Sequence, residues 1–534
     1  MIPTIQILVL LLIVIAAVSV VAARLKIPPA ILLVLTGVLL ALIPGLPTVT
    51  LAPEFVLLFI LPPLIYSSAV AMSWREFRFS LRPISMLAVG CVLFTTIATA
   101  AVTHWLLGFS WPVGFVLGAI VSPPDAVAPL SIARRMNLPR RLLVILEGEG
   151  LANDASALIL YRFAVAAVGV SAYSLSQAAG MFAAIIGGEI LWGIGVGWLM
   201  LRLRRWVHDP RIEVMLSVLT PFLAYLPPQH LGGSGVLATV TTGLYISWNG
   251  LRLISAETRL QGIFFWDFMI YLTEGFVFLI TGLQARTLIA GMRGDSLADL
   301  AGSAAVVCAV IIMARFIWMF PATYLPRWLI PAVARADPAP PWRWPFILAF
   351  TGVRGIVSLA AALAIPLTTN SGALFPDRDR ILFLTFAVIL VTLVGQGLML
   401  PLVIRLLGLA NAGERELETA RTEELLARRQ ASDAAIERLD HLAAEQGLPD
   451  DLVQRLQAVQ RERLRHFDHA PERKEDRRDR TAPPDEIELL LIAAERERIN
   501  ELYRQGTLKD DSRRRLEREL DLREANLAIH QHEE

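Results

Sequence analysis

The stretch "SPPDAVAP", residues 122–129, sets two prolines and an aspartate inside a segment that is otherwise apolar enough to cross a membrane. Pro123 and Pro124 each lack a backbone donor, and proline disfavours helical geometry in the residue before it. The pattern predicts a transmembrane helix that unwinds at the level of Asp125. Because ionisable side chains in a bilayer normally face protein or water, this carboxylate marks a candidate functional site.

Composition indicates a polytopic membrane protein. Hydrophobic residues make up 55% and charged residues 18% of the 534 positions, and the mean hydropathy is +0.55. A spanning helix needs about 20 apolar residues. The sequence predicts thirteen such spans, at residues 3–23, 28–46, 51–71, 83–107, 113–133, 142–169, 174–201, 212–230, 233–249, 262–284, 300–325, 345–367 and 381–408. Pro227 and Pro228 interrupt the eighth, and the first reads as a retained helix because no basic region precedes it.

Lys and Arg are distributed unevenly between the two sets of loops. The loops after spans 1, 3, 5, 7, 9 and 11 hold eighteen of these residues, and the opposite loops hold four. Basic short loops stay in the cytoplasm, so the sequence predicts a cell (inner) membrane protein with its N-terminus outside and its C-terminus inside. Cys91 and Cys308 fall within spans and are expected to be core thiols.

The composition changes after about residue 410, which divides the chain into a transmembrane domain at 1–409 and a cytoplasmic tail at 410–534. The tail has charged helical patterning at 416–447 and 485–530, with a charged linker at 468–485 between them. Mixed-sign charge at helical spacing is typical of a solvated helix face. A small helical domain is therefore expected, and regulation of the membrane part is the hypothesis for its role.

Polar residues inside the predicted spans are the candidates for function. They are Asp125, Glu149, Asn153, Asp154, Arg162, Glu189, Glu274, Arg315 and Arg354. Asp125 and Asp154 each lie about 12 residues from the start of their span, or roughly 18 Å at about 1.5 Å per residue, which is mid-membrane depth. Arg162 and Glu189 are expected to be structural, either near water or paired with each other.

The sixth span presents acids to two neighbours. Glu149 and Asn153 are four residues apart and share a helix face, whereas Asp154 is turned by about 100° from Asn153. A second break is predicted in the twelfth span, at the Gly-rich "FTGVRGIVSL" of residues 350–359. Broken helices at the midplane are typical of secondary transporters built from inverted repeats. The expected fold is all-α, with spans 1–6 repeated in 8–13 and broken crossing helices at spans 5 and 12.

Three motifs carry a family resemblance. "SPPDAV", "EGEGLANDASALILYRFAV" and "FTGVRGIVSLAAALAIP" resemble the core motifs of the monovalent cation/proton antiporter family, in its bacterial sodium/proton exchanger branch. The stretches "GGSGVLATVTTGLYIS" and "TEGFVFLITGLQ" match more loosely, and the tail from 486 to 521 resembles the soluble tail of that branch. The resemblance implies that Asp154 binds cation and proton alternately, with Asn153 as its neighbour and Asp125 as the acid at the helix break.

The resemblance also implies a structural ion pair and two missing ligands. Family members hold the carboxylate at Glu149 against a core arginine, for which Arg315 is the first choice here and Arg354 the second. The family often has Thr at the position of Pro124 and Ser at that of Gly150. With both hydroxyls absent, the ion is expected to rely on carboxylate, backbone carbonyl and water oxygens.

The expected activity is exchange of Na⁺ or Li⁺ for H⁺, with K⁺/H⁺ exchange as the alternative. These hard cations prefer oxygen ligands, and Asp154 and Asp125 supply them without any cofactor. Only Asp154 is left to titrate, so the exchange is expected to be electroneutral and to serve pH homeostasis. The expected partners are monovalent cations, protons, the lipid bilayer and, by family analogy, a second copy in a homodimer, with no nucleic acid.

Two other classes of protein share buried acids. A cation channel would conduct without proton coupling. A membrane-embedded enzyme could use Asp125 and Asp154 as general acid and base, but no His, Ser or metal-ligand cluster in the sequence converges on the pair. The protein is therefore expected to be a secondary transporter and not an enzyme.

Overall fold

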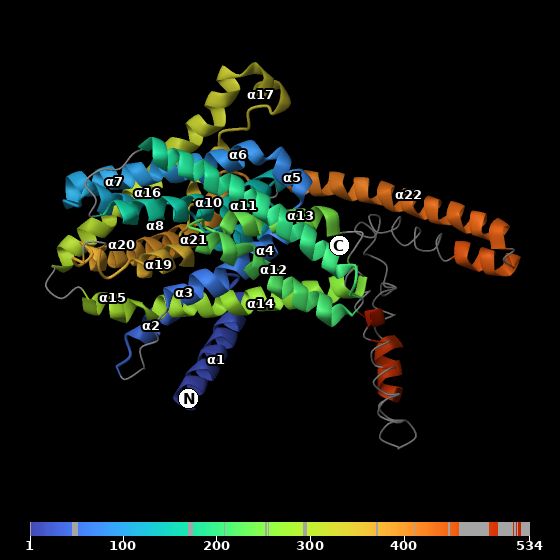
Figure 1. Cartoon of the computed structure of the whole chain (residues 1–534). Coiled ribbons are helices and arrows are strands. Elements are labelled where there is room, and N and C mark those ends of the chain that lie inside the picture. The colour runs from blue at the N-terminus through green and yellow to red at the C-terminus, as the bar shows by residue number, and fades with distance from the viewer. Residues whose placement is uncertain are drawn as a thin grey trace. The chain divides into compact units, whose positions relative to one another are not determined.

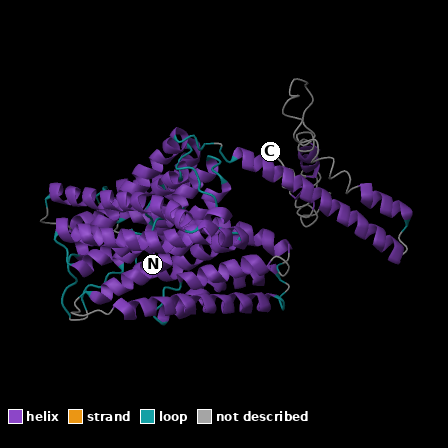
Figure 2. Ribbon diagram, turned by 90° about the horizontal axis from the view of Figure 1, so that it is seen from above, coloured by secondary structure: helices purple, strands orange, loops and turns teal. Residues whose placement is uncertain are grey.

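The computed structural model consists of helices, with one isolated β-bridge between Thr368 and Leu374, throughout the part of the chain that it describes (Figure 2). The described residues are 2–44, 52–168, 175–207, 209–250, 254, 256–291, 296–369, 372–410, 412–446, 449–458, 491–499, 516, 520 and 522–524. The chain divides into two compact units, Met1–Glu416 and Leu417–Glu534.

The helices follow the expected spans closely (Figure 1). Up to the sixth span they are α1 (Ile2–Leu25), α2 (Pro29–Ala41), α3 (Pro53–Phe55), α4 (Leu61–Ala71), α5 (Trp74–Phe79), α6 (Leu81–Ser85), α7 (Val92–Leu107), α8 (Trp111–Val121), α9 (Val127–Arg135) and α10 (Arg140–Ala167). Short π-helical turns at Val56–Ile60 and Met86–Cys91 join α3 to α4 and α6 to α7. Each of those pairs therefore forms one continuous helical rod.

The later helices complete the pattern. They are α11 (Leu175–Arg204), α12 (Pro210–His230), α13 (Val236–Asn249), α14 (Ala256–Leu283), α15 (Ala285–Gly291), α16 (Leu297–Leu329), α17 (Pro331–Ala336), α18 (Arg343–Phe350), α19 (Ile356–Leu363), α20 (Arg378–Leu390), α21 (Gly397–Leu406) and α22 (Glu414–Gln446). A π-helical turn at Val391–Gln396 joins α20 to α21. Pro227 and Pro228 do not interrupt α12, because they lie in its last turn and the Leu231 amide donates to both of their carbonyls.

Seven helical segments within the described residues are long and apolar enough to cross a membrane uninterrupted. The fifth and twelfth spans fail that length because each is split into two short helices, α8 with α9 and α18 with α19. An all-α polytopic membrane fold with two broken helices is thereby confirmed. The full number of thirteen crossings and the inverted repeat stay predictions.

The membrane helices pack in two groups. One contains α7, α8, α10, α16, α18, α19 and α20, and the other contains α1, α2, α4, α11, α12, α13 and α14. Glycines allow very close packing within the second group: a Cβ on Gly37 of α2 would lie 2.3 Å from the Leu279 carbonyl oxygen, and one on Gly282 of α14 would lie 2.2 Å from that of Val34. Small residues at such crossings let helix backbones approach each other in a membrane.

The second unit is partly described. Its helical residues 491–499 pair with the stretch around 520–524, because Arg496 bonds Glu524 at 2.6 Å and Arg523 bonds Glu495 at 3.0 Å. Ile492 is buried in the same small cluster. The predicted linker at 468–485 lies outside the described residues, as does most of the predicted helix at 485–530.

Candidate functional site

The two helix breaks cross each other. The backbone between α8 and α9 is unwound at Pro123 and Pro124, and the backbone between α18 and α19 is unwound across the Gly-rich turn. The Asp125 amide donates to the Val353 carbonyl at 2.7 Å. Two unwound segments more than 200 positions apart in the sequence are thus joined by a backbone hydrogen bond. Such bonds are needed here because buried backbone N–H and C=O groups require a partner.

Gly355 lets Asp125 approach the second break. A Cβ built on Gly355 would lie 1.7 Å from the Asp125 Oδ2 atom and 2.5 Å from its Cγ atom. No side chain fits at that position without moving the carboxylate. The requirement for glycine here follows from this close approach, since the backbone of Gly355 is extended.

Charged side chains bind the free backbone groups at the ends of the short helices α8 and α9. The Asp125 Oδ1 atom accepts from the Val127 amide at 2.9 Å, at the start of α9. Arg354 is fully buried and donates from Nε to the Val121 carbonyl at 2.9 Å, at the end of α8, and from Nη1 to the Gly352 carbonyl. A negative charge at a helix N-terminus and a positive charge at a C-terminus are both stabilised by the helix dipole.

Glu149 and Arg315 form a bidentate ion pair. Arg315 donates from Nη1 to Glu149 Oε1 at 2.5 Å and from Nη2 to Oε2 at 2.8 Å, and the two side chains are only 1% and 2% exposed. Arg315 also donates to the Leu348 carbonyl of α18 from Nε and Nη2, at 3.1 and 2.9 Å. The structure thus pairs Glu149 with Arg315, the first of its two expected partners. Arg354 instead donates hydrogen bonds to backbone carbonyls at the two helix breaks.

Asn153 connects α10 to the unwound segment between α8 and α9 by a hydrogen bond. Its Nδ2 atom donates to the Pro124 carbonyl at 2.6 Å, whereas its Oδ1 atom is buried and accepts no hydrogen bond from the described residues. Two backbone carbonyls at the break, those of Val121 and Pro124, each accept a side-chain donor. Only their second lone pairs remain for an ion.

Asp154 lies on a large cavity. The cavity has a volume of about 860 Å³, and its inner end is lined by Asp154, Asp125, Pro124 and Gly150 together with Gly355. Asp154 is half-buried, and no hydrogen bond or ion pair to it is formed by the described residues. Its carboxylate is therefore available to a ligand that enters through the cavity.

Gly150 and Pro124 supply no side-chain oxygen to this cavity. A Cβ on Gly150 would lie 2.7 Å from the Ala126 Cβ, so a serine there would have to push α9 aside. The missing hydroxyl at Gly150 follows from close packing between α10 and the start of α9. Nothing in the structure explains the second proline at Pro124 beyond its place in the unwound segment.

Helix α14 contributes more residues to the cavity than the sequence alone predicts. Glu274, Tyr271 and Asp267 of this helix all line the same cavity, and Asp125 lies within electrostatic range of both Asp154 and Glu274. Spacings of three and four residues place the three side chains on one helix face. The sequence indicates that Glu274 is an interior acid, but only the loosely matching motif "TEGFVFLITGLQ" relates it to the site.

Glu189 has a structural partner other than Arg162. Its carboxylate accepts from the backbone amides of Ser234 at 2.5 Å, Gly235 at 3.0 Å and Leu237 at 3.0 Å, and so caps the start of α13. The expected structural role is retained, and the expected pairing with Arg162 is replaced by this cap.

The cavity reaches one end of the helix bundle. Lining residues from its outer part are Arg134 of α9, Arg204 of α11, Glu213 of α12 and Arg259 of α14. These residues lie at or near the loops that follow spans 5, 7 and 9, which are the Arg-rich loops. The described residues contain no group of three or more His, Cys, Asp or Glu side chains that could hold a metal ion.

Comparison with known proteins gives a consistent result. A family model described as "Sodium/hydrogen exchanger, transmembrane" matches residues 8–406. An uncharacterised Na⁺/H⁺ exchanger of Mycobacterium bovis is 38% identical over 449 residues, covering 83% of this chain and 81% of the relative. The sodium, potassium, lithium and rubidium/H⁺ antiporter of Bacillus subtilis is 32% identical over 387 residues, covering 70% of this chain and 58% of the relative.

A solved structure shares the fold. The map of the sodium proton antiporter NhaP1 from Methanocaldococcus jannaschii matches with a TM-score of 0.61 and 20% sequence identity, covering 75% of this chain and 97% of that one. At this identity the likeness concerns the fold alone.

Proposed function

The chain belongs to the sodium/hydrogen exchanger family, and on that premise we propose that it exchanges Na⁺ or Li⁺ for H⁺ by binding cation and proton alternately at Asp154. Members of this family are membrane transporters, so the protein is a transporter and not an enzyme. The proposal concerns the ion, the stoichiometry and the residues that carry the exchange.

The observation that carries the proposal is the unpartnered carboxylate of Asp154 at the inner end of the cavity. A monovalent cation that enters the cavity would balance the charge of Asp154, and Asp125 supplies a further carboxylate on the same cavity.

Competition at one carboxylate produces exchange. Asp154 can hold a proton or a cation but not both at once, so each ion displaces the other. The empty site carries a negative charge, which is unfavourable in the barrier of the membrane. Reorientation with the site filled then couples inward movement of one ion to outward movement of the other, without ATP or covalent chemistry.

The charges at the site favour an electroneutral exchange. Glu149 is neutralised by Arg315, Asp125 is held at the start of α9, and Asn153 does not titrate. One proton then exchanges for one cation at Asp154. Glu274, Asp267, Glu213 and Glu147 also line the cavity, and the one-for-one exchange requires that none of these four acids changes its protonation during the cycle.

K⁺/H⁺ exchange is the second candidate. The absence of side-chain hydroxyls at Pro124 and Gly150 leaves fewer rigid ligands, and a less rigid site discriminates less well between cations of different size. The printed name of the Bacillus subtilis relative includes sodium, potassium, lithium and rubidium. Both observations favour broad selectivity over strict preference for Na⁺.

The proposed setting is a homodimer in the inner membrane that contributes to pH homeostasis. The distribution of Lys and Arg supports a cytoplasmic C-terminus, and the cavity then faces the cytoplasm. Alternating access would move the α8–α10 and α18–α20 group against the α2 and α12–α14 group, between which the cavity lies. The helical tail at 410–534 is proposed to regulate this motion.

Inside-out vesicles test the proposed ions directly. A proton gradient is formed, Na⁺, Li⁺ and K⁺ are added separately over a range of pH, and proton release is followed by a fluorescent pH probe. Release on addition of Na⁺ or Li⁺, absent from vesicles without the protein, is the expected result. Release with K⁺ alone would replace the first proposal by the second, and no release with any of the three would contradict both.

A further inference from the structure

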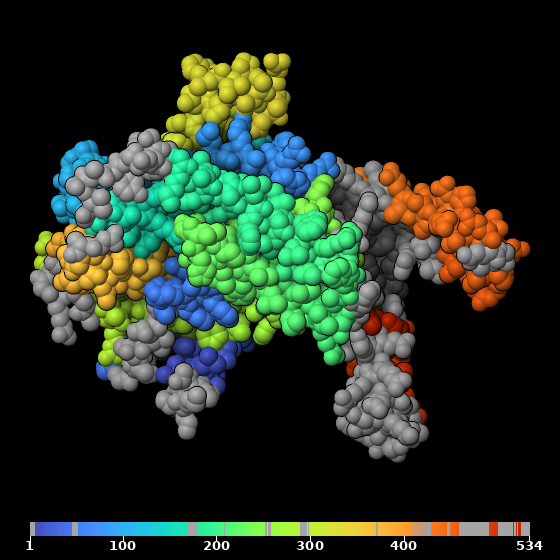
Figure 3. Space-filling view, in the orientation of Figure 1, coloured from blue at the N-terminus to red at the C-terminus, as the bar shows by residue number. Residues whose placement is uncertain are grey.

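Three arginines from distant parts of the chain meet at one aspartate. Asp337, in the turn after α17, accepts from Arg82 at 2.5 Å and Arg327 at 2.7 Å through Oδ2, and from Arg141 at 2.6 Å through Oδ1. Figure 3 shows the segment around α17, in yellow, standing out from the surface beside the blue helices α5 and α6. The cluster therefore lies at one end of the helix bundle.

The cluster carries more positive charge than its carboxylate balances. Three guanidinium groups and one carboxylate leave a formal charge of two positive units. Among the described side chains, Arg82 and Arg141 donate hydrogen bonds only to Asp337, and the Arg141 guanidinium also lies 5.5 Å from the centre of the Phe79 ring. The Nε atom of Arg141 is buried without an acceptor. Unsatisfied guanidinium donors in a planar fork fit the oxygens of a phosphate group.

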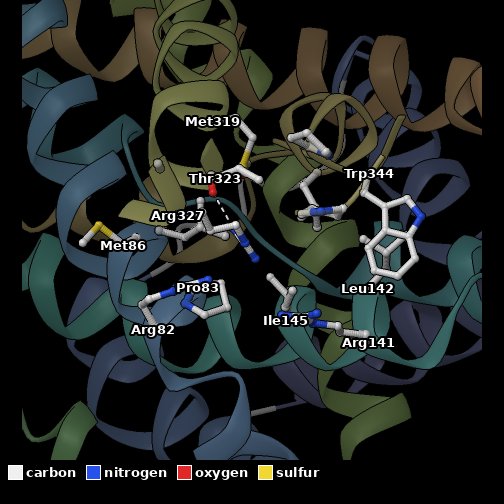
Figure 4. A pocket seen from close by; sticks show the side chains of 15 residues that line it. Arg82, Pro83, Met86, Arg141, Leu142, Ile145, Met319, Thr323, Arg327 and Trp344 are labelled. Atoms are coloured by element: carbon white, nitrogen blue, oxygen red, sulfur yellow. Dashed lines mark hydrogen bonds between the residues drawn. The ribbon is translucent and has the colours of Figure 1, made fainter. Parts of the chain in front are cut away.

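A small cavity opens between these arginines. It has a volume of about 40 Å³ and is lined by Arg82, Arg141, Arg327, Met86 and Trp344, among others (Figure 4). A single buried water needs only about 10–15 Å³, so the space exceeds that of one water and suits one small anionic group. Apolar side chains make up the rest of the wall.

The position corresponds to the headgroup level of a bilayer. Arg82 and Arg327 stand at the ends of the apolar segments Leu81–Leu107 and Ala298–Leu329, which are long enough to cross a membrane, and Arg141 stands at the start of α10. Trp328, which follows Arg327 directly, and Trp342, a few positions after Asp337, are 80% and 55% exposed. Exposed Trp residues concentrate at membrane interfaces, and basic pockets between transmembrane helices bind anionic lipid headgroups.

We propose that this cluster is a binding site for the phosphate of an anionic phospholipid. The lipid phosphate would share the three guanidinium groups with Asp337 while its acyl chains lie along the exposed faces of α6–α7 and α16. Leu348 lines the same cavity, and its carbonyl accepts two bonds from Arg315. A bound lipid therefore contacts α18 next to the Glu149–Arg315 pair. This inference does not depend on which ion is transported.

The test measures lipid binding to the full-length protein in detergent. Phosphatidylglycerol, phosphatidylcholine and inorganic phosphate are titrated separately, thermal melting is followed, and bound lipid is counted by native mass spectrometry. The variant R82Q/R141Q removes two of the donors. The matched control R75Q/R78Q removes the same charge from the exposed surface of the neighbouring helix α5.

Phosphatidylglycerol is expected to bind and stabilise the wild type and the control, and to bind R82Q/R141Q at least about tenfold more weakly, the effect of losing about 1.4 kcal/mol. D337N is expected to bind phosphatidylglycerol at least as tightly as the wild type, because the competing carboxylate is gone. If the double variant does not fold, binding of phosphatidylglycerol by the single variants R82Q and R141Q is compared with that of the wild type instead.

Three results would overturn the proposal. Undiminished binding of phosphatidylglycerol by R82Q/R141Q would place the lipid elsewhere. Loss of binding in D337N equal to that in the arginine variants would mean that the cluster only holds the α17 turn. Stabilisation by inorganic phosphate without any response to phosphatidylglycerol would assign the site to a soluble anion.

Discussion

Replacing Glu149 by glutamine isolates the charge of Arg315 inside the protein. The pair has two short hydrogen bonds, at 2.5 and 2.8 Å, and both side chains are almost completely buried. Loss of one partner of a buried ion pair destabilises by about 3–5 kcal/mol. With roughly 2 °C of melting temperature per kcal/mol for a large protein, E149Q should melt about 6–10 °C lower.

The double variant E149Q/R315Q tests whether the cost arises from the pair. Removing both charges leaves no isolated guanidinium, so the double variant should lose about 2–3 kcal/mol less than the sum of the single variants. The exposed pair of Glu76 and Arg140 is a matched control. It is also bidentate, at 3.0 and 2.7 Å, but its side chains are 36% and 57% exposed.

Melting curves of all six variants in detergent provide the measurement. For E76Q, R140Q and their double variant, the coupling should be about 1 kcal/mol or less, as for surface ion pairs. Strict additivity of E149Q and R315Q would refute the reasoning, since it would mean that the two side chains do not depend on each other. Equal coupling in the buried and the exposed pair would show that burial does not set the magnitude.

Three further predictions concern the cavity. G355A should lower the exchange rate about 100-fold, because a methyl group 1.7 Å from Asp125 Oδ2 must move the carboxylate by more than about 1 Å. A wild-type exchange rate of G355A in proteoliposomes would contradict the close approach of the two helix breaks. Exchange by the wild type should not change when the membrane potential is clamped at different values, and a steep dependence would implicate Asp125 or Glu274. E274Q should retain exchange but require a several-fold higher cation concentration, because it removes one negative charge from the cavity wall; complete loss of exchange would make Glu274 part of the transport site.

Local sequence signals predicted the helix breaks well. Pro123 and Pro124 forbid a continuous helix through backbone chemistry alone, and the structure begins α9 only at Val127. Depth along a span also follows from residue counting, which is why Asp125 and Asp154 could be assigned to the same level. These features depend on a few neighbouring residues and therefore need no knowledge of the tertiary fold.

Contacts between distant segments could not be predicted in the same way. The bond from the Asp125 amide to the Val353 carbonyl depends on how two broken helices cross. Likewise, nothing in the sequence brings Asp337 to Arg82, 255 positions away. The sequence offers both Arg315 and Arg354 as partners of Glu149, because both arginines reach similar depth. Only the tertiary structure distinguishes them, since it directs Arg315 to Glu149 and the Leu348 carbonyl and Arg354 to the Val121 carbonyl.

The central claim is that Asp154 carries both ions, and D154N tests it most directly. Asparagine keeps the shape of the side chain but neither titrates nor attracts a cation by charge. In proteoliposomes, D154N should fold with wild-type melting behaviour or better and show no proton release on addition of Na⁺, Li⁺ or K⁺. The control D267N, at an exposed acid on the same cavity about 10 Å along α14 from Glu274, should still exchange. Cation-dependent proton release by D154N at a substantial fraction of the wild-type rate would contradict the assignment.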